Sequence, residues 1–144
     1  MTHRIPRTIG EIMTRDVYVL DENDNLAHLL ETMRLLRFRH TPVVDGDKAV
    51  GMLTERDLLR VSASSLLPSA REQDALLKER FHVRDIMTRD VITVSEGMPL
   101  REAGQLLLRK RVGCLLVVDA DNRLLGLVTE NDLAKLALSL LESR

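Results

Sequence analysis

The pattern Thr-Glu-x-Asp occurs twice in the sequence, at residues 54–57 and at residues 129–132. Both copies follow a short apolar run, so each marks the end of a predicted strand and the start of a predicted helix. At such a helix N-terminus the free N–H groups and the threonine hydroxyl can bind a phosphate. The carboxylate of Asp57 or Asp132 can accept hydrogen bonds from a ribose diol. Phosphate donors beside a ribose acceptor are the chemistry that a nucleotide needs.

A simpler interpretation of the same residues is helix capping. A threonine followed three positions later by an acidic residue resembles a capping box, and such a pattern is more often a cap than a binding site. A cap needs no preceding glycine, however, and Gly51 and Gly126 each lie three residues before the threonine. Glycine at that position permits close approach by a ligand or by a neighbouring strand. The sequence leaves both interpretations open.

An internal repeat determines the organisation of the chain. The hexapeptide Ile-Met-Thr-Arg-Asp-Val at residues 12–17 recurs as residues 86–91. Val-Val-Asp at 43–45 recurs at 117–119, and residues 51–58 resemble residues 126–133. Such a repeat predicts two similar units that share one fold, so that any site is expected twice or between the units.

Each repeat predicts the order strand, helix, strand, turn, strand, helix. The first strands are expected at 17–20 and 91–94, where residues are β-branched or aromatic. Apolar stripes then predict amphipathic helices. The stripe consists of Leu26, Leu29, Leu30 and Met33 in the first repeat and of Leu100, Ala103 and Leu107 in the second.

Buried strands are predicted at 41–44 and 115–118, and their hairpin partners at 50–53 and 125–128. Turn sequences at 45–47 and 119–122 separate the strands of each hairpin. Between the repeats, residues 61–82 read as a linker with a short helix at 71–80, which gives the domains 1–60, 61–82 and 83–144.

The last predicted helix spans residues 130–142 and carries an apolar face almost to its end. This face contains Leu133, Leu136, Ala137, Leu140 and Leu141. We expect it to cover the core or to meet another subunit.

Composition excludes several classes of protein. A chain of 144 residues suits one domain, and each repeat would be marginal alone. No apolar run approaches the roughly 18 residues that span a bilayer, and no signal peptide opens the sequence. The single Cys114 fits a reducing compartment, so we expect a cytoplasmic protein. The net charge of −1, with no Trp, one Tyr and two Phe, argues against nucleic acid and anionic membranes as partners.

No catalytic or metal-binding pattern is present in the sequence. His3, His28 and His82 are scattered, without carboxylates or thiols at metal spacing. No Ser-His-Asp arrangement, Walker loop or dinucleotide fingerprint appears. Cys114 lies at a strand start between Gly113 and Leu115, which predicts a core residue. We therefore expect a non-catalytic protein with no metal and no required cofactor.

The order of these motifs in both halves resembles the CBS domain, which is named after cystathionine β-synthase. Each repeat begins with Ile-Met-Thr-x-x-Val, continues with an apolar strand ending in Val-Val-Asp, and closes with Gly-x-x-Thr-x-x-Asp. Two such domains in tandem resemble a Bateman module, and the resemblance covers nearly the whole chain. It implies an α/β fold of two β-α-β-β-α repeats packed with pseudo-two-fold symmetry. It also implies a ligand that contains adenosine, such as AMP, ADP, ATP or S-adenosylmethionine, in the cleft between the repeats.

The resemblance assigns roles in a first cleft. Asp57 would hold the ribose and Thr54 the phosphate, and His40 and Arg56 would add phosphate contacts. The apolar slot for the adenine would come from the other repeat, from Ile92, Val112 and Gly113. On the residues alone, His40 is equally well a surface histidine near a strand start.

In a second cleft, Asp132 and Thr129 would take the same two roles. Tyr18, Phe38 and Arg39 would close its base pocket. The family pattern is broken here, because Cys114 stands where the first repeat has His40 and Leu116 where it has Pro42. This difference lowers the expected phosphate affinity of the second cleft, so the sequence favours the first.

The resemblance implies a regulatory module that forms homodimers. A ligand that contacts both repeats would shift the population towards one relative orientation, and a separate effector protein would sense the change. The alternative is a structural or interaction module whose clefts stay empty and which acts through dimerisation. Enzymatic turnover would require a nucleophile, base or metal that the sequence does not offer.

Overall fold

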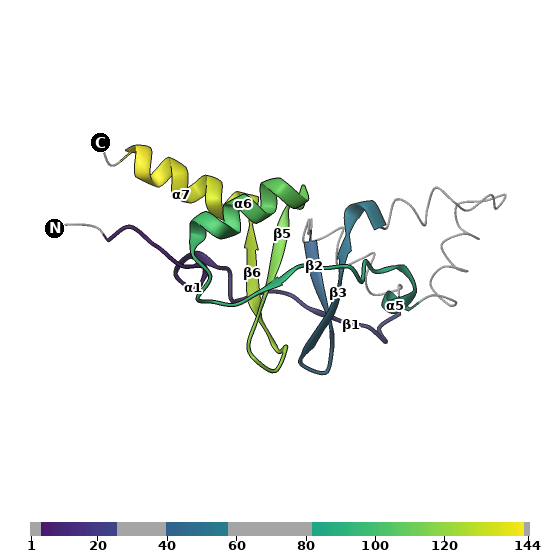
Figure 1. The fold of residues 1–144 in the computed structure, drawn as a ribbon. Coiled ribbons are helices and arrows are strands. Elements are labelled where there is room, and N and C mark those ends of the chain that lie inside the picture. Colours follow the sequence, from purple (N-terminus) through teal and green to yellow (C-terminus); the bar gives the residue numbers. More distant parts are fainter. Residues whose placement is uncertain (1–3, 26–39, 58–81, 143–144) are drawn as a thin grey trace. The chain divides into compact units, whose positions relative to one another are not determined.

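The structure, a computed structural model, describes residues 4–25, 40–57 and 82–142 (Figure 1). It divides into two compact units. We call Tyr18–Val91 the central unit, and Met1–Val17 together with Ile92–Arg144 the terminal unit. The units do not follow the sequence repeats, because the chain passes from one unit to the other after Val17 and returns after Val91. The proposed division at residues 60 and 82 stays a prediction.

The central unit contains a three-stranded sheet. Its strands are β1 (Leu20–Asp21), β2 (His40–Asp45) and β3 (Lys48–Thr54), in the order β1-β2-β3. β1 runs parallel to β2, and β2 and β3 form an antiparallel hairpin. The short helix α5 (Val83–Ile86) follows. The core cluster of the central unit consists of Leu20, Val43, Leu53, Val83 and Met87.

The terminal unit repeats this sheet and adds helices. It contains α1 (Ile9–Ile12), β4 (Thr93–Val94), α6 (Leu100–Lys110), β5 (Cys114–Val118), β6 (Leu124–Thr129) and α7 (Glu130–Glu142). The sheet order is β4-β5-β6, with β4 parallel to β5 and β5 antiparallel to β6. α6 and α7 lie on the same side of this sheet (Figure 1). The core cluster is formed by Ile9, Met13, Val94, Leu100, Ala103, Leu107, Leu115, Val117 and Val128.

The two hairpins confirm the predicted inner strands and turns. Each hairpin has a register shift before its turn, between Val43 and Val44 in β2 and between Val117 and Val118 in β5. Each turn also has one residue with positive φ, which is Gly46 at 66° and Asn122 at 64°. Glycine and asparagine are the residues that adopt this conformation at least cost, so both turns have a local chemical basis.

The first strand of each sheet is shorter than the sequence predicts. Only Leu20 and Asp21 pair with β2, and only Thr93 and Val94 pair with β5. In the terminal unit the N–H of Leu116 donates to the carbonyl oxygen of Ile92 at 3.0 Å. Pro42 stands where β5 has Leu116 and has no N–H to donate, so β1 starts one residue later than β4.

Helices α6 and α7 agree with the predicted pattern, whereas the short helices α1 and α5 were not predicted. α6 buries Leu100, Ala103 and Leu107, which form the predicted stripe. α7 has the predicted bounds but contains no fully buried residue. The predicted helix around Leu26–Met33 and the linker helix at 71–80 lie outside the described residues. The mixed α/β class is confirmed, and no helix in the described part of the chain is long and apolar enough to cross a membrane.

Candidate functional site

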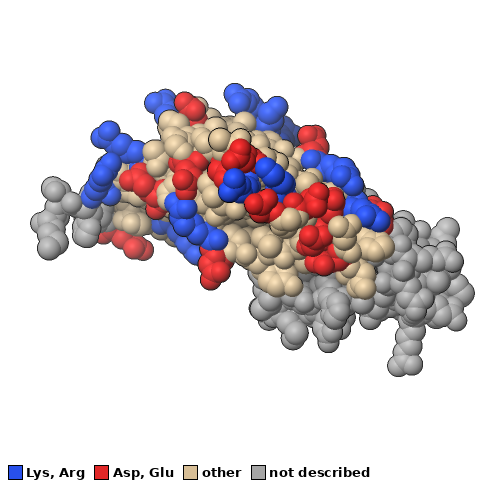
Figure 2. Space-filling view, turned by 90° about the horizontal axis from the view of Figure 1, so that it is seen from below, with Lys and Arg blue, Asp and Glu red and all other residues tan. Residues whose placement is uncertain are grey.

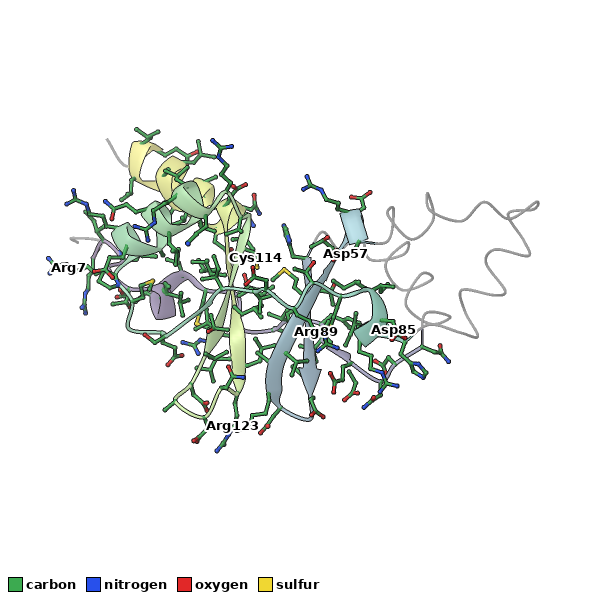
Figure 3. All side chains as sticks on the ribbon, turned by 45° about the vertical axis from the view of Figure 1, so that its right-hand side comes forward. Arg7, Asp57, Asp85, Arg89, Cys114 and Arg123 are labelled. Carbon is green, nitrogen blue, oxygen red and sulfur yellow. The ribbon has the colours of Figure 1, made fainter. Side chains whose placement is uncertain are left out.

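The first Thr-x-x-Asp motif forms a capping box where β3 ends and a helical turn begins. The backbone N–H of Thr54 donates to Oδ2 of Asp57 at 2.9 Å, and the Thr54 hydroxyl donates to the same oxygen at 3.0 Å. In return, the N–H of Asp57 donates to Oγ1 of Thr54 at 3.3 Å. Figure 3 shows Asp57 on this turn. The capping interpretation of the motif is therefore confirmed, while its role in ligand binding stays a prediction.

The second motif has nearly the same geometry at the junction of β6 and α7. The N–H and the hydroxyl of Thr129 donate to Oδ2 of Asp132 at 2.9 and 3.1 Å. The N–H of Asp132 donates to Oγ1 of Thr129 at 3.2 Å. In both motifs the proton of the threonine hydroxyl is thus committed to the carboxylate. A phosphate bound here would be held by backbone N–H groups unless that hydroxyl changed its partner.

The glycine before each motif admits a neighbouring chain segment. A Cβ atom on Gly51 would lie 2.8 Å from Sδ of Met87 and 2.8 Å from the carbonyl oxygen of Thr88. On Gly126 it would lie 2.3 Å from the carbonyl oxygen of Thr14 and 2.6 Å from Cε of Met13. The repeated Met-Thr pair therefore lies directly against the strand, and the space that glycine provides is filled by protein.

Backbone hydrogen bonds fix these Met-Thr pairs to the edges of the sheets. Thr88 and Met52 exchange two N–H···O bonds of 2.8 and 2.9 Å. Thr14 and Leu127 do the same, also at 2.8 and 2.9 Å. Each Met-Thr pair thus acts as a one-residue extension of the sheet in its own unit.

The threonine of each pair also reaches the aspartate of the motif. The Thr88 hydroxyl lies 3.0 Å from Oδ1 and 3.2 Å from Oδ2 of Asp57. The Thr14 hydroxyl lies 3.3 Å from Oδ1 of Asp132. Thr14 and Thr88 are not among the site residues that the sequence predicts. The signal was available, because the hexapeptide that contains them recurs without change.

His40 and Cys114 occupy equivalent positions at the start of the central strand of each sheet. His40 pairs with Thr54, and Cys114 pairs with Thr129. Cys114 is buried, as predicted, and is seen within the terminal unit in Figure 3. Burial raises the pKa of its thiol to about 12, and the negative charge of Asp132 adds to the rise. Cys114 is therefore a neutral thiol at physiological pH.

The other predicted site residues are distributed over the two units. Ile92 and Val112 are half-buried against the terminal core, and the carbonyl oxygen of Gly113 accepts a hydrogen bond from the N–H of Glu130 at 3.0 Å. In the central unit Arg56 and Tyr18 are exposed. Phe38 and Arg39 lie outside the described residues. The assignment of these residues to two ligand sites stays a prediction.

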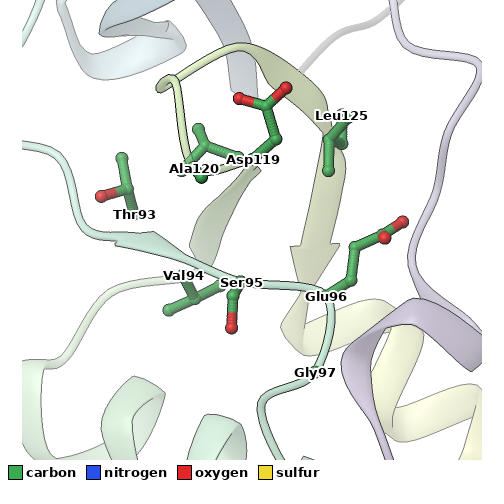
Figure 4. Close-up of a pocket in the computed structure, with 9 residues that line it drawn as sticks. Thr93, Val94, Ser95, Glu96, Gly97, Asp119, Ala120 and Leu125 are labelled. Carbon is green, nitrogen blue, oxygen red and sulfur yellow. The ribbon is translucent and has the colours of Figure 1, made fainter.

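A separate pocket of about 530 Å³ lies in the terminal unit (Figure 4). It is lined by Thr93, Val94, Ser95, Glu96, Gly97, Val118, Asp119, Ala120 and Leu125. This is the turn end of the hairpin, opposite the end that carries Asp132. Its acidic groups already have partners: Glu96 binds Arg15 at 2.6 Å, and Asp119 accepts the N–H groups of Asp121 and Arg123. The sequence did not predict this pocket, and no free charged group in it specifies a ligand.

The charges of the described residues give no further site. The face in Figure 2 shows basic and acidic side chains interspersed rather than separated into patches. Among the residues described, no group of three or more His, Cys, Asp or Glu side chains could hold a metal ion.

Comparison with known families gives a match in both halves of the chain. The sequence model described as "CBS domain" matches residues 9–64 and again residues 83–139. An uncharacterized protein of Methanocaldococcus jannaschii is 34% identical over 129 residues. That match covers 88% of this chain and 46% of the relative, so the chain spans about half the length of that relative.

Two solved structures with similar folds contain adenine nucleotides. CBSX2 in complex with AMP is 27% identical, has a TM-score of 0.77, and is matched over 94% of this chain and 98% of that one. The CBS domain of a bacterial CNNM/CorC family Mg²⁺ transporter in complex with ATP is also 27% identical, with a TM-score of 0.74. The match covers 91% of this chain and 87% of that one.

Proposed function

The chain belongs to the CBS domain family, and we propose that it is a non-catalytic regulatory module that binds a ligand containing adenosine. The candidate ligands are AMP, ADP, ATP and S-adenosylmethionine. The observation that carries the proposal is the carboxylate at a helix N-terminus, which occurs twice with the same threonine cap. The similar structures with AMP and ATP support the ligand class.

The chemistry of binding follows from the groups that such a motif offers. A ribose hydroxyl can donate to an accessible aspartate at this position, and a charged acceptor makes such a bond stronger than a neutral one. Backbone N–H groups at the helix N-terminus, with its positive dipole, bind the phosphate. α7 spans 13 residues, long enough to provide such a terminus next to Asp132.

Regulation would then be a population shift. A ligand that binds one conformation of the module more tightly shifts the equilibrium towards that conformation. The free energy of the shift is at most the difference between the ligand's binding free energies for the two conformations. We propose that an effector protein senses this change and that the module works as a homodimer in the cytoplasm. The dimer proposal is supported by α7, where Leu138 and Leu141 are 58% and 68% exposed. Exposed leucines on one helix are typical of a surface that binds another subunit.

Thermal unfolding across a set of ligands tests the ligand proposal. The protein is heated with AMP, ADP, ATP, S-adenosylmethionine or NADH at millimolar concentration. A ligand present at 100 times its Kd stabilises the native state by about 2.7 kcal/mol. For a chain of this size that corresponds to a rise in Tm of roughly 5–10 °C.

A variant with Asp57→Asn and Asp132→Asn together is the matched control. Relative to its own Tm without ligand, its rise in Tm with each ligand should be much smaller than that of the unaltered protein. The alternative function, an interaction module with empty sites, predicts that the Tm of the unaltered protein does not change with any ligand. That result would contradict the proposal. Conversion of the nucleotide by the purified protein would contradict its non-catalytic part.

A further inference from the structure

The two motif carboxylates differ in how far they are already satisfied by the protein. Asp57 is only 3% exposed. Its Oδ2 accepts hydrogen bonds from the N–H and hydroxyl of Thr54, and the Thr88 hydroxyl lies within 3.2 Å of both carboxylate oxygens. A buried carboxylate that the protein's own donors already satisfy serves to hold the structure together.

The carboxylate of Asp132 is more exposed than that of Asp57 and has fewer close protein donors. It is half-exposed, and its Oδ1 has a single protein donor in the described structure, the Thr14 hydroxyl at 3.3 Å. Thr14 is itself exposed, so its hydroxyl can exchange this long bond for water or for a ligand oxygen. Oδ2 is held by Thr129, which keeps the carboxylate oriented while Oδ1 remains accessible.

The strand position paired with Thr129 carries no charge in the terminal unit. Cys114 takes the place that His40 has in the central unit, and its thiol is neutral. A hydroxyl group that approaches Oδ1 of Asp132 therefore replaces one weak donor. At Asp57 it would have to displace the Thr88 hydroxyl from a buried carboxylate, which is the more costly exchange.

We infer that this chain binds the ribose of one adenosine ligand at Asp132, whereas Asp57 is a structural carboxylate that holds Thr88 against the central sheet. This inference rests on the proposed function and deepens it, because it assigns unequal roles to the two motifs. It also reverses the preference for the first motif that the sequence alone suggests.

The test compares AMP with 2′,3′-dideoxy-AMP, which lacks both ribose hydroxyls. Isothermal titration calorimetry gives the Kd and the stoichiometry of each nucleotide for the unaltered protein, Asp132→Asn and Asp57→Asn. The unaltered protein should bind one AMP per chain and prefer it to the dideoxy analogue by roughly 10- to 100-fold, the value of a hydrogen bond to a charged acceptor.

Asp57→Asn should keep this preference and lower the Tm. Asp132→Asn should lose the preference and lower the Tm less than Asp57→Asn does, because only its capping bonds to Thr129 are weakened. A purely structural role for Asp132 would not remove discrimination between the two nucleotides. If Asp57→Asn does not fold, the Asp132→Asn variant alone tests the inference. The inference then requires that this variant binds AMP and 2′,3′-dideoxy-AMP with the same, weakened affinity.

Three results would overturn the inference. Asp132→Asn could retain the preference for AMP, a folded Asp57→Asn could lose it, or two AMP molecules could bind per chain. Each of these leaves the proposed function intact. Failure of the unaltered protein to bind any of AMP, ADP, ATP and S-adenosylmethionine would overturn the proposed function and the inference together.

Discussion

At the scale of single residues, the two repeated threonines show how one hydrogen bond changes with its surroundings. Thr88 and Thr14 donate to equivalent aspartates, yet Asp57 is buried and Asp132 is half-exposed. Water can replace a lost donor at an exposed carboxylate but not at a buried one. The same substitution should therefore have unequal effects on stability at the two positions.

We predict that Thr88→Val lowers the free energy of unfolding by about 1–3 kcal/mol, because it leaves a buried carboxylate with fewer donors. Thr14→Val should cost less than about 1 kcal/mol, since solvent compensates. Urea denaturation of both variants measures the difference. Thr88→Ser retains the hydroxyl and should keep most of the stability. Equal losses for the two valine variants would refute the unequal roles of Asp57 and Asp132.

At the scale of elements, each unit packs a Met-Thr pair against a glycine in a strand of its sheet. A methyl group on Gly126 would meet the carbonyl oxygen of Thr14 at 2.3 Å, and a backbone atom cannot move away without breaking its bonds to Leu127. Gly104 on α6 provides a contrast, because a Cβ there meets only Cδ1 of Leu133, at 3.8 Å.

We predict that Gly126→Ala destabilises the protein by about 1–3 kcal/mol through overpacking. Gly104→Ala should instead stabilise it by about 0.5–1 kcal/mol, because alanine is the better helix former. Thermal or urea unfolding of the two variants gives both values. A Gly126→Ala variant as stable as the unaltered protein would show that Met13 and Thr14 do not pack against β6 as described.

The sequence predicted the elements better than it predicted their contacts. The hairpins, α6 and α7 were predictable because local patterns specify them: turn residues, an apolar stripe and a threonine cap. The late start of β1 was also predictable in principle, since Pro42 lacks the N–H that Leu116 uses. The docking of Thr14 on Asp132 was not, because these residues lie far apart in the chain and no local pattern records which strand a distant segment will meet.

At the scale of the whole molecule, α7 keeps leucines exposed in the part of the chain that the structure describes, although its Leu133 and Leu136 pack against the terminal core. Leu138 and Leu141 lie on one face of the helix, and no residue of α7 is fully buried. On the proposed homodimer, this face provides at least part of the subunit interface.

We predict that the unaltered protein sediments as a dimer and that Leu138→Lys with Leu141→Lys shifts it to a monomer. Two lysines would place like charges opposite one another in a desolvated contact. Analytical ultracentrifugation over a range of concentrations measures the change. Ser139→Lys, which adds the same charge at an exposed position on another side of the helix, is the control and should remain dimeric. A double lysine variant that stays dimeric would place the interface elsewhere.

The division of the chain between its units has a consequence for the order in which the protein folds during synthesis. Residues 18–91 form one unbroken segment, so the central unit has all of its residues once that segment has left the ribosome. The terminal unit buries Ile9 and Met13 against strands that are translated much later, from residue 93 onward. These two apolar side chains therefore stay unpacked until the strands of the terminal unit have been translated. Ile9 and Met13 are therefore translated before the central unit and buried after it, and in this interval the nascent chain exposes apolar side chains to chaperones and to aggregation.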